Sequence, residues 1–146
     1  MYENCLARVA SEIEDLHRFF VDWFASAVNK EVFEERFIKR FSKDFIIIPP
    51  AGHFLGLAQI SDAIRSGYGS NPNFRIQIRN VQIQREMGGY IVATYEEWQK
   101  NALATTPPNN GRIATVIFED ADPLRWCHIH ETSLPEDVVS ADEYNF

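Results

Sequence analysis

The sequence predicts an α+β fold in which three N-terminal helices pack on a strongly curved antiparallel sheet. The first observation is a change in apolar spacing, which is three to four residues in the early segments and two residues after residue 73. The second is a series of Gly- and Pro-rich turns that divides the second half into strand-like segments. Helices followed by a run of strands are typical of domains whose helices cover one face of an antiparallel sheet.

Three helices and one early strand are expected before residue 73. Residues 4–28 carry a single apolar stripe at helical spacing, and residues 30–41 (KEVFEERFIKRF) repeat this pattern over a shorter length. Residues 44–48 are an apolar, Ile-rich run ended by two prolines, which suits a short strand. The third helix is expected over residues 57–69 (LAQISDAIRSGYG), where glycines end it.

Four strands are expected in the remainder, joined as a meander. In the first, Phe74, Ile76 and Ile78 share one phase, whereas Val81 takes the opposite phase. A β-bulge at Arg79–Asn80 would produce this slip, and because bulges bend strands it predicts a curved sheet. The other three strands are expected at residues 90–100, 112–119 and 124–132. The turns before them are expected at residues 87–89, 107–111 and 120–123, respectively.

Length and charge limit the possible functions. The 146 residues suit one domain, which we place at residues 1–134, followed by an acidic C-terminal tail at residues 135–146. The net charge of −7 argues against a nucleic-acid partner, and interleaved charges argue against a membrane-surface helix. The sequence has no apolar stretch of membrane-spanning length, and its two cysteines form no disulfide framework. A cytoplasmic protein is expected.

Several features together resemble the nuclear transport factor 2-like superfamily, which has a cystatin-like cone fold and includes the SnoaL-like polyketide cyclases. They are the long first helix, the Phe-rich second helix, the Ile48–Pro49 turn, Gly56 before the third helix, and the long bent hairpin. The ending CHIHETS, with GRIATVIFED before it, resembles the last two strands of the calcium/calmodulin-dependent protein kinase II association domain and its stand-alone bacterial relatives. The resemblance spans about residues 4–134. It implies a cone-shaped barrel with a cavity at its open end, and a homodimer formed through the convex face of the sheet.

The histidines of the last strand are assigned by alternation. Alternate residues of a strand share a face, so Trp126, His128 and His130 lie on one side and Cys127 and Glu131 on the other. Because cysteine favours the interior, the first three are expected on the convex face, which by the resemblance is the dimer interface. A metal site is not predicted, since zinc needs at least a third protein ligand. An acid/base or ligand-contact role for the two histidines stays open.

The same alternation sends Glu131 toward the cavity mouth. The resemblance implies that Arg112 matches one of the arginines with which the related association domains hold carboxylate ligands. The second arginine of that pattern is missing, because the sequence is apolar near Val92. A simple Arg112–Glu131 salt bridge therefore also fits. Three aromatic residues, Trp23, Tyr68 and Trp98, complete the set of expected ligand-binding side chains.

A catalytic carboxylate is the main sign of possible enzymatic activity. Either Glu96 or Glu97 points inward, depending on the phase of the strand, which the sequence leaves open. A carboxylate among aromatic rings has a raised pKa and can act as a general acid or base. Both glutamates being solvated near a strand end is the alternative. No nucleophile–base pair, phosphate loop or dinucleotide motif is present in the sequence, and no cofactor is predicted.

The function expected first is that of a dimeric domain that binds a small organic molecule in an aromatic-lined cavity, without demonstrable catalysis. Aromatic residues make up 13% of the chain and include eleven phenylalanines, which fits such a cavity. The first alternative is a SnoaL-like or ketosteroid-isomerase-like acid/base enzyme, working as an isomerase, cyclase or dehydratase. The second is an assembly module whose oligomerisation is itself the function.

Overall fold

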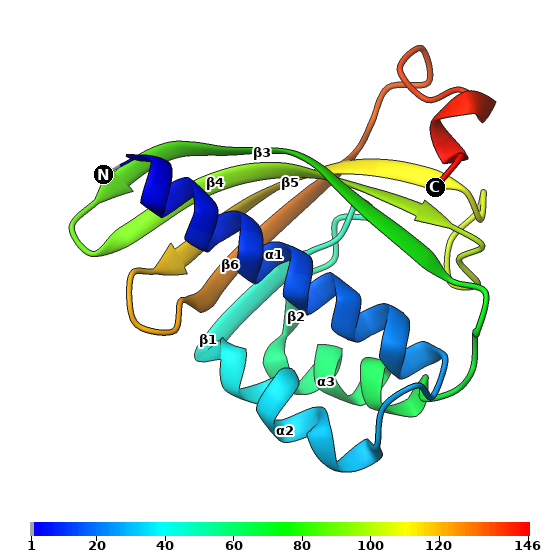
Figure 1. The fold of residues 1–146 in the computed structure, drawn as a ribbon, viewed down its shortest axis with the longest axis horizontal. Helices are drawn as coiled ribbons and strands as arrows, with labels where there is room; N and C mark the ends of the chain where they lie inside the picture. The colour runs from blue at the N-terminus through cyan, green and yellow to red at the C-terminus, as the bar shows by residue number, and fades with distance from the viewer. Residues whose placement is uncertain (1) are drawn as a thin grey trace.

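The computed structural model describes residues 2–146 and confirms the α+β class (Figure 1). The helices within this range are α1 (Tyr2–Phe24), α2 (Phe33–Arg36) and α3 (Leu57–Ser66), with 3-10 helices η1 (Lys30–Val32), η2 (Ile38–Arg40) and η3 (Ala141–Tyr144). The strands are β1 (Phe41–Ile48), β2 (Leu55–Gly56), β3 (Arg75–Met87), β4 (Tyr90–Lys100), β5 (Asn110–Glu119) and β6 (Arg125–Ser133).

The sheet found within residues 2–146 is six-stranded and mixed, with the order β2-β1-β6-β5-β4-β3. Strands β3 to β6 form the predicted antiparallel meander. Strand β1 instead pairs in parallel with β6, so that Ile46 lies opposite His128, and β2 adds to its other edge. The sheet is curved as expected, but it is mixed where an antiparallel sheet was expected, and it stays open instead of forming a barrel. The chain between β1 and β6 returns through α3 and the meander, which allows the parallel pairing.

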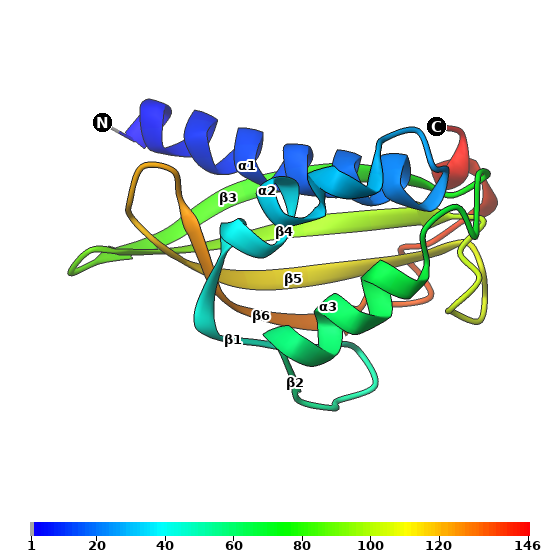
Figure 2. The same ribbon diagram turned by 90° about the horizontal axis from the view of Figure 1, so that it is seen from below.

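Helix α1 supplies one side of the core. It lies along the inner face of the sheet (Figure 2). The sheet is curved, so that β3 lies beside α1 and β1 lies near α3. The buried side chains of α1 follow the predicted stripe and are Cys5, Val9, Ile13, Leu16, His17, Phe19 and Trp23. The opposite face of α1 is charged. None of the helices between residues 2 and 146 combines the length and apolarity needed to cross a membrane.

The predicted second helix is broken into short turns. Only α2 keeps α-helical geometry, and Phe37 leaves it with φ −125°. The segment nevertheless buries Phe33 and Phe37 against α1, where the Phe19 and Phe37 rings stack with centroids 6.0 Å apart. The aromatic stripe is therefore core, although its backbone does not form one continuous helix.

The predicted bulge in β3 is confirmed. The pairing of β3 with β4 shifts between Arg79 and Gln82, and Asn80 takes a positive φ of 55°. Gly88 and Gly89 form the hairpin turn with φ values of 53° and 89°, which glycine adopts without a Cβ clash. The bulge bends β3, and the curled sheet leaves a cavity between its inner face, α1 and α3.

The C-terminal segment, expected as an acidic tail after the domain, packs against the outer face of the sheet. It leaves β6, makes an open loop and returns as η3 beside β4 (Figure 1). The Tyr144 ring contacts the Trp98 ring with centroids 5.7 Å apart. Residues 135–146 thus cover a part of the convex face in the monomer.

Candidate functional site

An interior cavity of about 210 Å³ lies between α1, α3 and the inner face of the sheet. Most of its lining is apolar and includes six phenylalanines and a tyrosine, which are Phe20, Phe24, Phe37, Phe41, Phe45, Phe74 and Tyr95. Polar side chains gather on one part of the wall and are His17, Glu97, Gln99, Arg112 and Glu131. An apolar cavity with a small group of polar side chains is the usual form of a small-molecule site.

Strand β4 decides which glutamate enters the cavity. Its residues Tyr95, Glu97 and Gln99 are buried on the inner face. Glu96 lies on the outer face, where it accepts hydrogen bonds from Asn80 Nδ2 at 2.7 Å and Trp98 Nε1 at 2.9 Å. The register of β4 with β5 is unbroken, so the phase change of the hairpin is confined to β3. Glu97, and not Glu96, is therefore the cavity residue.

A buried ion pair joins α1 to β4. His17 Nε2 lies 3.0 Å from Glu97 Oε1, and His17 Nδ1 lies 2.7 Å from the Ile13 carbonyl oxygen. A carbonyl oxygen only accepts, so Nδ1 carries a proton, and Nε2 faces a carboxylate, which favours the imidazolium form. Burial opposes the charge of His17, but the charge and hydrogen bond of Glu97, together with the hydrogen bond to the Ile13 carbonyl, outweigh it and raise the His17 pKa. Burial likewise opposes the charge of Glu97, but the charge and hydrogen bond of His17, with smaller contributions from Arg112 and Gln99, lower the Glu97 pKa to about 2.

His17 is a site residue that the sequence pattern does not reveal. It occupies a position of the apolar α1 stripe, four residues after Ile13, where a histidine looks like a core residue. Its partner Glu97 is 80 residues away in the sequence. The only available signal was a polar residue at an otherwise apolar position of the stripe.

A second ion pair lies across the cavity wall between β5 and β6. Arg112 Nη1 is 3.2 Å from Glu131 Oε1, and Arg112 Nη2 donates to Asn110 Oδ1 at 3.2 Å. Burial and the nearby negative charge of Glu97 raise the pKa of Glu131 to about 7, against the opposing charge of Arg112. Both predicted residues thus lie in the cavity, and Glu131 titrates near neutral pH.

Two buried polar atoms of the cavity wall have no hydrogen-bond partner among residues 2–146. They are the Tyr95 hydroxyl and Arg112 Nε. Burial, with the charge of Glu97, raises the pKa of Tyr95 well above its usual value, so the hydroxyl keeps its proton and can donate. A buried donor without a partner costs about 1–3 kcal/mol, and such groups commonly mark a place filled by a ligand or water.

Three aromatic residues expected to bind ligand lie outside the cavity wall. Trp23 donates through Nε1 to the Ile64 carbonyl at 2.7 Å, and Tyr68 donates to the Val28 carbonyl at 2.7 Å. Their rings contact each other with centroids 4.6 Å apart, so they fasten α1 to α3 and the segments around it. Trp98 faces the opposite side of the sheet, under the C-terminal segment. The structure therefore does not bring these three residues into the cavity.

The placement of Trp126 on the convex face is also wrong. In the pairing of β6 with β5, Trp126 lies opposite Phe118 and His128 opposite Ile117, so Cys127 is an extra, bulged residue. This bulge reverses the side-chain phase. Trp126 is fully buried and donates through Nε1 to Glu12 Oε2 at 2.9 Å. His128 and His130 face outward, and residues 2–146 contain no cluster of three or more His, Cys, Asp or Glu side chains suited to a metal ion.

The architecture is shared with solved structures of one superfamily. A nuclear transport factor 2-like protein of unknown function from Pseudomonas aeruginosa superposes with a TM-score of 0.77 and 25% identity, covering 88% of this chain and 99% of that chain. The protein has the nuclear transport factor 2-like fold. The superfamily indicated by the sequence is thereby confirmed.

Other solved structures with the nuclear transport factor 2-like fold are described as different kinds of protein. The CamKII hub homology domain of Chlamydamonas reinhardtii has a TM-score of 0.55 and 11% identity, covering 73% of this chain and 87% of that chain. A protein from Shewanella frigidimarina, provisionally described as a ketosteroid isomerase, has a TM-score of 0.60 and 12% identity, covering 86% and 94%. No protein-family model and no curated protein matches the chain. At these identities the similarity concerns the fold, and the function must be argued from the site.

Proposed function

We propose that the protein binds a small organic molecule in the interior cavity of its nuclear transport factor 2-like fold. The observation that carries this proposal is the pair of buried, unpartnered donors, Tyr95 Oη and Arg112 Nε, beside a largely apolar wall that includes six phenylalanines. An acceptor atom on a ligand would satisfy one or both donors, and the phenylalanine rings would bury its apolar body. Both contributions favour the occupied cavity over the empty one.

The charges of the cavity favour an uncharged ligand. His17 pairs with Glu97 and Arg112 pairs with Glu131, so the four charges balance each other above the Glu131 pKa of about 7. A carboxylate ligand would add a buried charge without a free partner, which is strongly unfavourable. We therefore infer a compact molecule with a carbonyl or similar acceptor and an apolar, preferably aromatic, body.

The proposal is tested first by native mass spectrometry of the purified protein, followed by denaturation to release any bound molecule. Acetophenone and benzoate then serve as matched probes, because they are similar in size and differ in charge. At pH 8, where Glu131 is ionised, acetophenone should bind and benzoate should bind more weakly, as measured by ligand-observed NMR.

The Tyr95→Phe variant removes one donor and keeps the ring. It should weaken acetophenone binding by about tenfold, the loss expected for one hydrogen bond worth about 1.4 kcal/mol. Glu96→Gln on the outer face of the same strand is the control and should bind as the wild type does. Equal affinity of Tyr95→Phe and wild type would remove the tyrosine from the site.

An acid/base enzyme is the second candidate, favoured by Glu131. With a pKa of about 7, Glu131 suits proton abstraction near neutral pH, whereas Glu97, with a pKa of about 2, is a weak base. Glu131 would take a proton from the carbon next to a carbonyl group, and the Tyr95 hydroxyl would donate a hydrogen bond to the oxygen of the resulting enolate.

Deuterium exchange at the methyl group of acetophenone in D2O, followed by NMR, tests this step. Exchange above the buffer rate that falls at least about a hundredfold in Glu131→Gln would support catalysis. Binding without exchange would leave the protein as a binding domain for this probe. An assembly module, the remaining alternative, has less support, because it does not require polar groups inside the cavity.

A further inference from the structure

A separate feature lies on the outer face of the sheet, away from the cavity. Trp98 points to this face and yet is only 2% exposed. It is covered by the C-terminal segment, whose Tyr144 ring meets it edge-on at 5.7 Å, and by Arg79, whose guanidinium lies 4.4 Å from the indole ring centroid. An aromatic residue on an outer sheet face is here buried by the chain's own residues 135–146.

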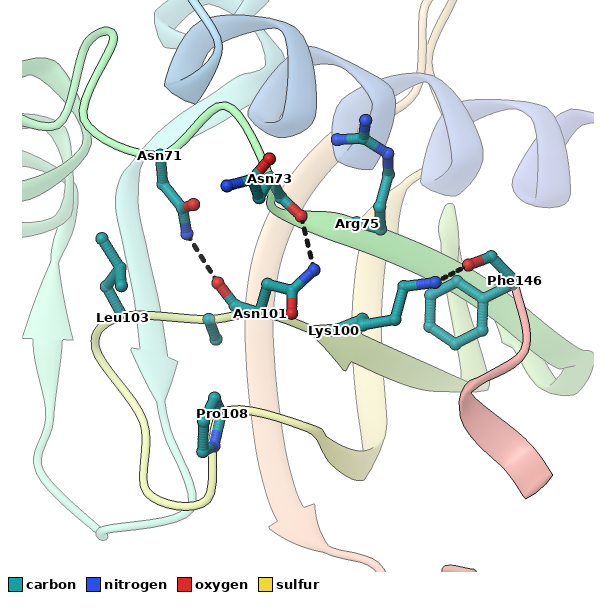
Figure 3. A pocket seen from close by; sticks show the side chains of 9 residues that line it. Asn71, Asn73, Arg75, Lys100, Asn101, Leu103, Pro108 and Phe146 are labelled. Atoms are coloured by element: carbon teal, nitrogen blue, oxygen red, sulfur yellow. Dashed lines mark hydrogen bonds between the residues drawn. The ribbon is translucent and has the colours of Figure 1, made fainter. Parts of the chain in front are cut away.

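Basic side chains around Trp98 hold the segment by both side chain and backbone. Arg79 contacts the Glu143 carboxylate at 2.6 Å through Nη1 and donates to the Glu143 carbonyl oxygen at 2.7 Å through Nη2. Lys100 donates through Nζ to the Phe146 oxygen and lies 5.0 Å from the centre of the Phe146 ring (Figure 3). Arg79 and Lys100 thus bind a carboxylate, an aromatic ring and main-chain oxygens of the segment. Peptide-recognition sites use the same combination of contacts.

The docking surface formed by Arg79, Trp98 and Lys100 is built by the sheet and not by the segment that covers it. Trp98 Nε1 is fixed by Glu96 Oε1 at 2.9 Å, and Arg79 Nε is fixed by Gln77 Oε1 at 2.5 Å. A Cβ at Gly111 would come within 3.2 Å of the indole, so the glycine gives the ring room to lie flat on the sheet. The surface is therefore largely preorganised for its occupant.

The segment itself is held shallowly. None of residues 135–146 is buried, and the Glu143 side chain remains 40% exposed. The segment carries acidic residues and no Lys or Arg, whereas the surface beneath is basic. A pocket of about 570 Å³ continues beyond Phe146, lined by Asn73, Arg75 and Asn101 among others (Figure 3). The segment and the surface have opposite charges, the segment is not buried, and there is free space beside it. These features indicate that another peptide segment can replace residues 135–146 on this surface.

We propose that Arg79, Trp98 and Lys100 form a docking site for an acidic, aromatic peptide segment, which residues 143–146 occupy in cis. The partner in trans would present a carboxylate followed by aromatic side chains, in the pattern of Glu143-Tyr144-Asn145-Phe146. Tethering gives the cis segment a high effective concentration, so a partner binds only when the segment is released. This inference goes beyond the proposed cavity function and does not depend on it.

The test uses the full chain with the cis segment weakened by Glu143→Lys, Tyr144→Ala and Phe146→Ala. A fluorescent peptide of residues 135–146, with the wild-type sequence, is titrated with this triple variant and with wild type, and its fluorescence anisotropy is measured. The triple variant should bind the peptide at least about tenfold more tightly, because its docking site is no longer occupied. Glu143→Lys alone, measured in the same way, should show an intermediate gain.

A charge exchange identifies the site. Adding Arg79→Glu to the triple variant should reduce peptide binding at least about tenfold, and a peptide carrying Glu143→Lys should restore it. Circular dichroism and the midpoint of thermal unfolding confirm that each variant is folded. If folded triple and single variants bind the peptide no better than wild type, or if Arg79→Glu leaves their binding unchanged, the docking site is refuted.

Discussion

At the scale of single residues, the cavity brings two ion pairs close enough to influence each other. The charge of Glu97 is stabilised by His17 and Arg112, and together with burial it raises the pKa of Glu131 on the neighbouring strands of the wall. Glu97 is therefore ionised around neutral pH and raises the pKa of His17, whereas Glu131 changes its charge there. Glu97 is therefore a structural carboxylate, and Glu131 is the carboxylate of the cavity whose charge changes with pH.

This difference predicts a pH-dependent stability. The Glu131 pKa rises from 4.5 to about 7 on folding, so the folded state holds a proton that the unfolded state loses above pH 4.5. The free energy of unfolding should therefore fall as pH rises from 4.5 to 7, with an upper limit of about 1.4 kcal/mol per unit of pKa difference. Urea titrations at pH 5, 6, 7 and 8 measure it.

Glu131→Gln should flatten this dependence between pH 5 and 7, and Glu96→Gln should not. His17 has a raised pKa, so its contribution is present below its unfolded value of 6.5 and is lost above its folded pKa in both variants. Glu97 acts in a separate window, since its contribution is lost only as pH falls from 4.5 toward 2. An unchanged slope in Glu131→Gln would contradict the raised pKa.

At the scale of elements, β6 shows how far strand alternation can be trusted. The slip in β3 is visible in the sequence because apolar residues continue in the new phase after Asn80. The bulge at Cys127 does not show in the sequence. His128 and His130 keep the alternation that a regular strand would have, so nothing marks the change of phase between Trp126 and His128. The inward side of Glu131 was therefore predicted, and that of Trp126 was not.

The corrected position of Trp126 changes the expected effect of its substitution. Trp126→Ala should destabilise the fold by about 3–5 kcal/mol, because it empties a fully buried site packed against Phe118 and removes the hydrogen bond to Glu12. His130→Ala, exposed on the same strand, should change stability by less than about 0.5 kcal/mol. Urea unfolding of the two variants compares them, and similar midpoints would place Trp126 at the surface after all.

At the scale of the whole molecule, local sequence patterns predict the elements better than their assembly. The helical stripe, the β3 bulge and the hairpin glycines are local signals, and each corresponds to a feature of the structure. The parallel pairing of β1 with β6 and the return of residues 135–146 to the sheet are long-range contacts without a local signal. The same limit hid the partnership of His17 with Glu97.

Self-association through the outer face remains a proposal that His128 can test. Two copies related by a twofold axis would bring the β6 histidines of both chains to one interface, so His128→Asp should place negative charges on both sides of it and weaken dimerisation. Gel filtration with light scattering measures the subunit count, with His53→Asp in an exposed loop as the control. Unchanged assembly of His128→Asp would exclude β6 from the interface.

The bulged strand β3 has one more consequence, for the behaviour of the protein at high concentration. β3 is an edge of the sheet, where a regular strand would offer unpaired backbone groups to other molecules. Its register shifts twice, between Arg79 and Gln82 and between Ile83 and Arg85, so its edge is neither straight nor flat. The bends that curve the sheet around a cavity therefore also discourage edge-to-edge growth into aggregates.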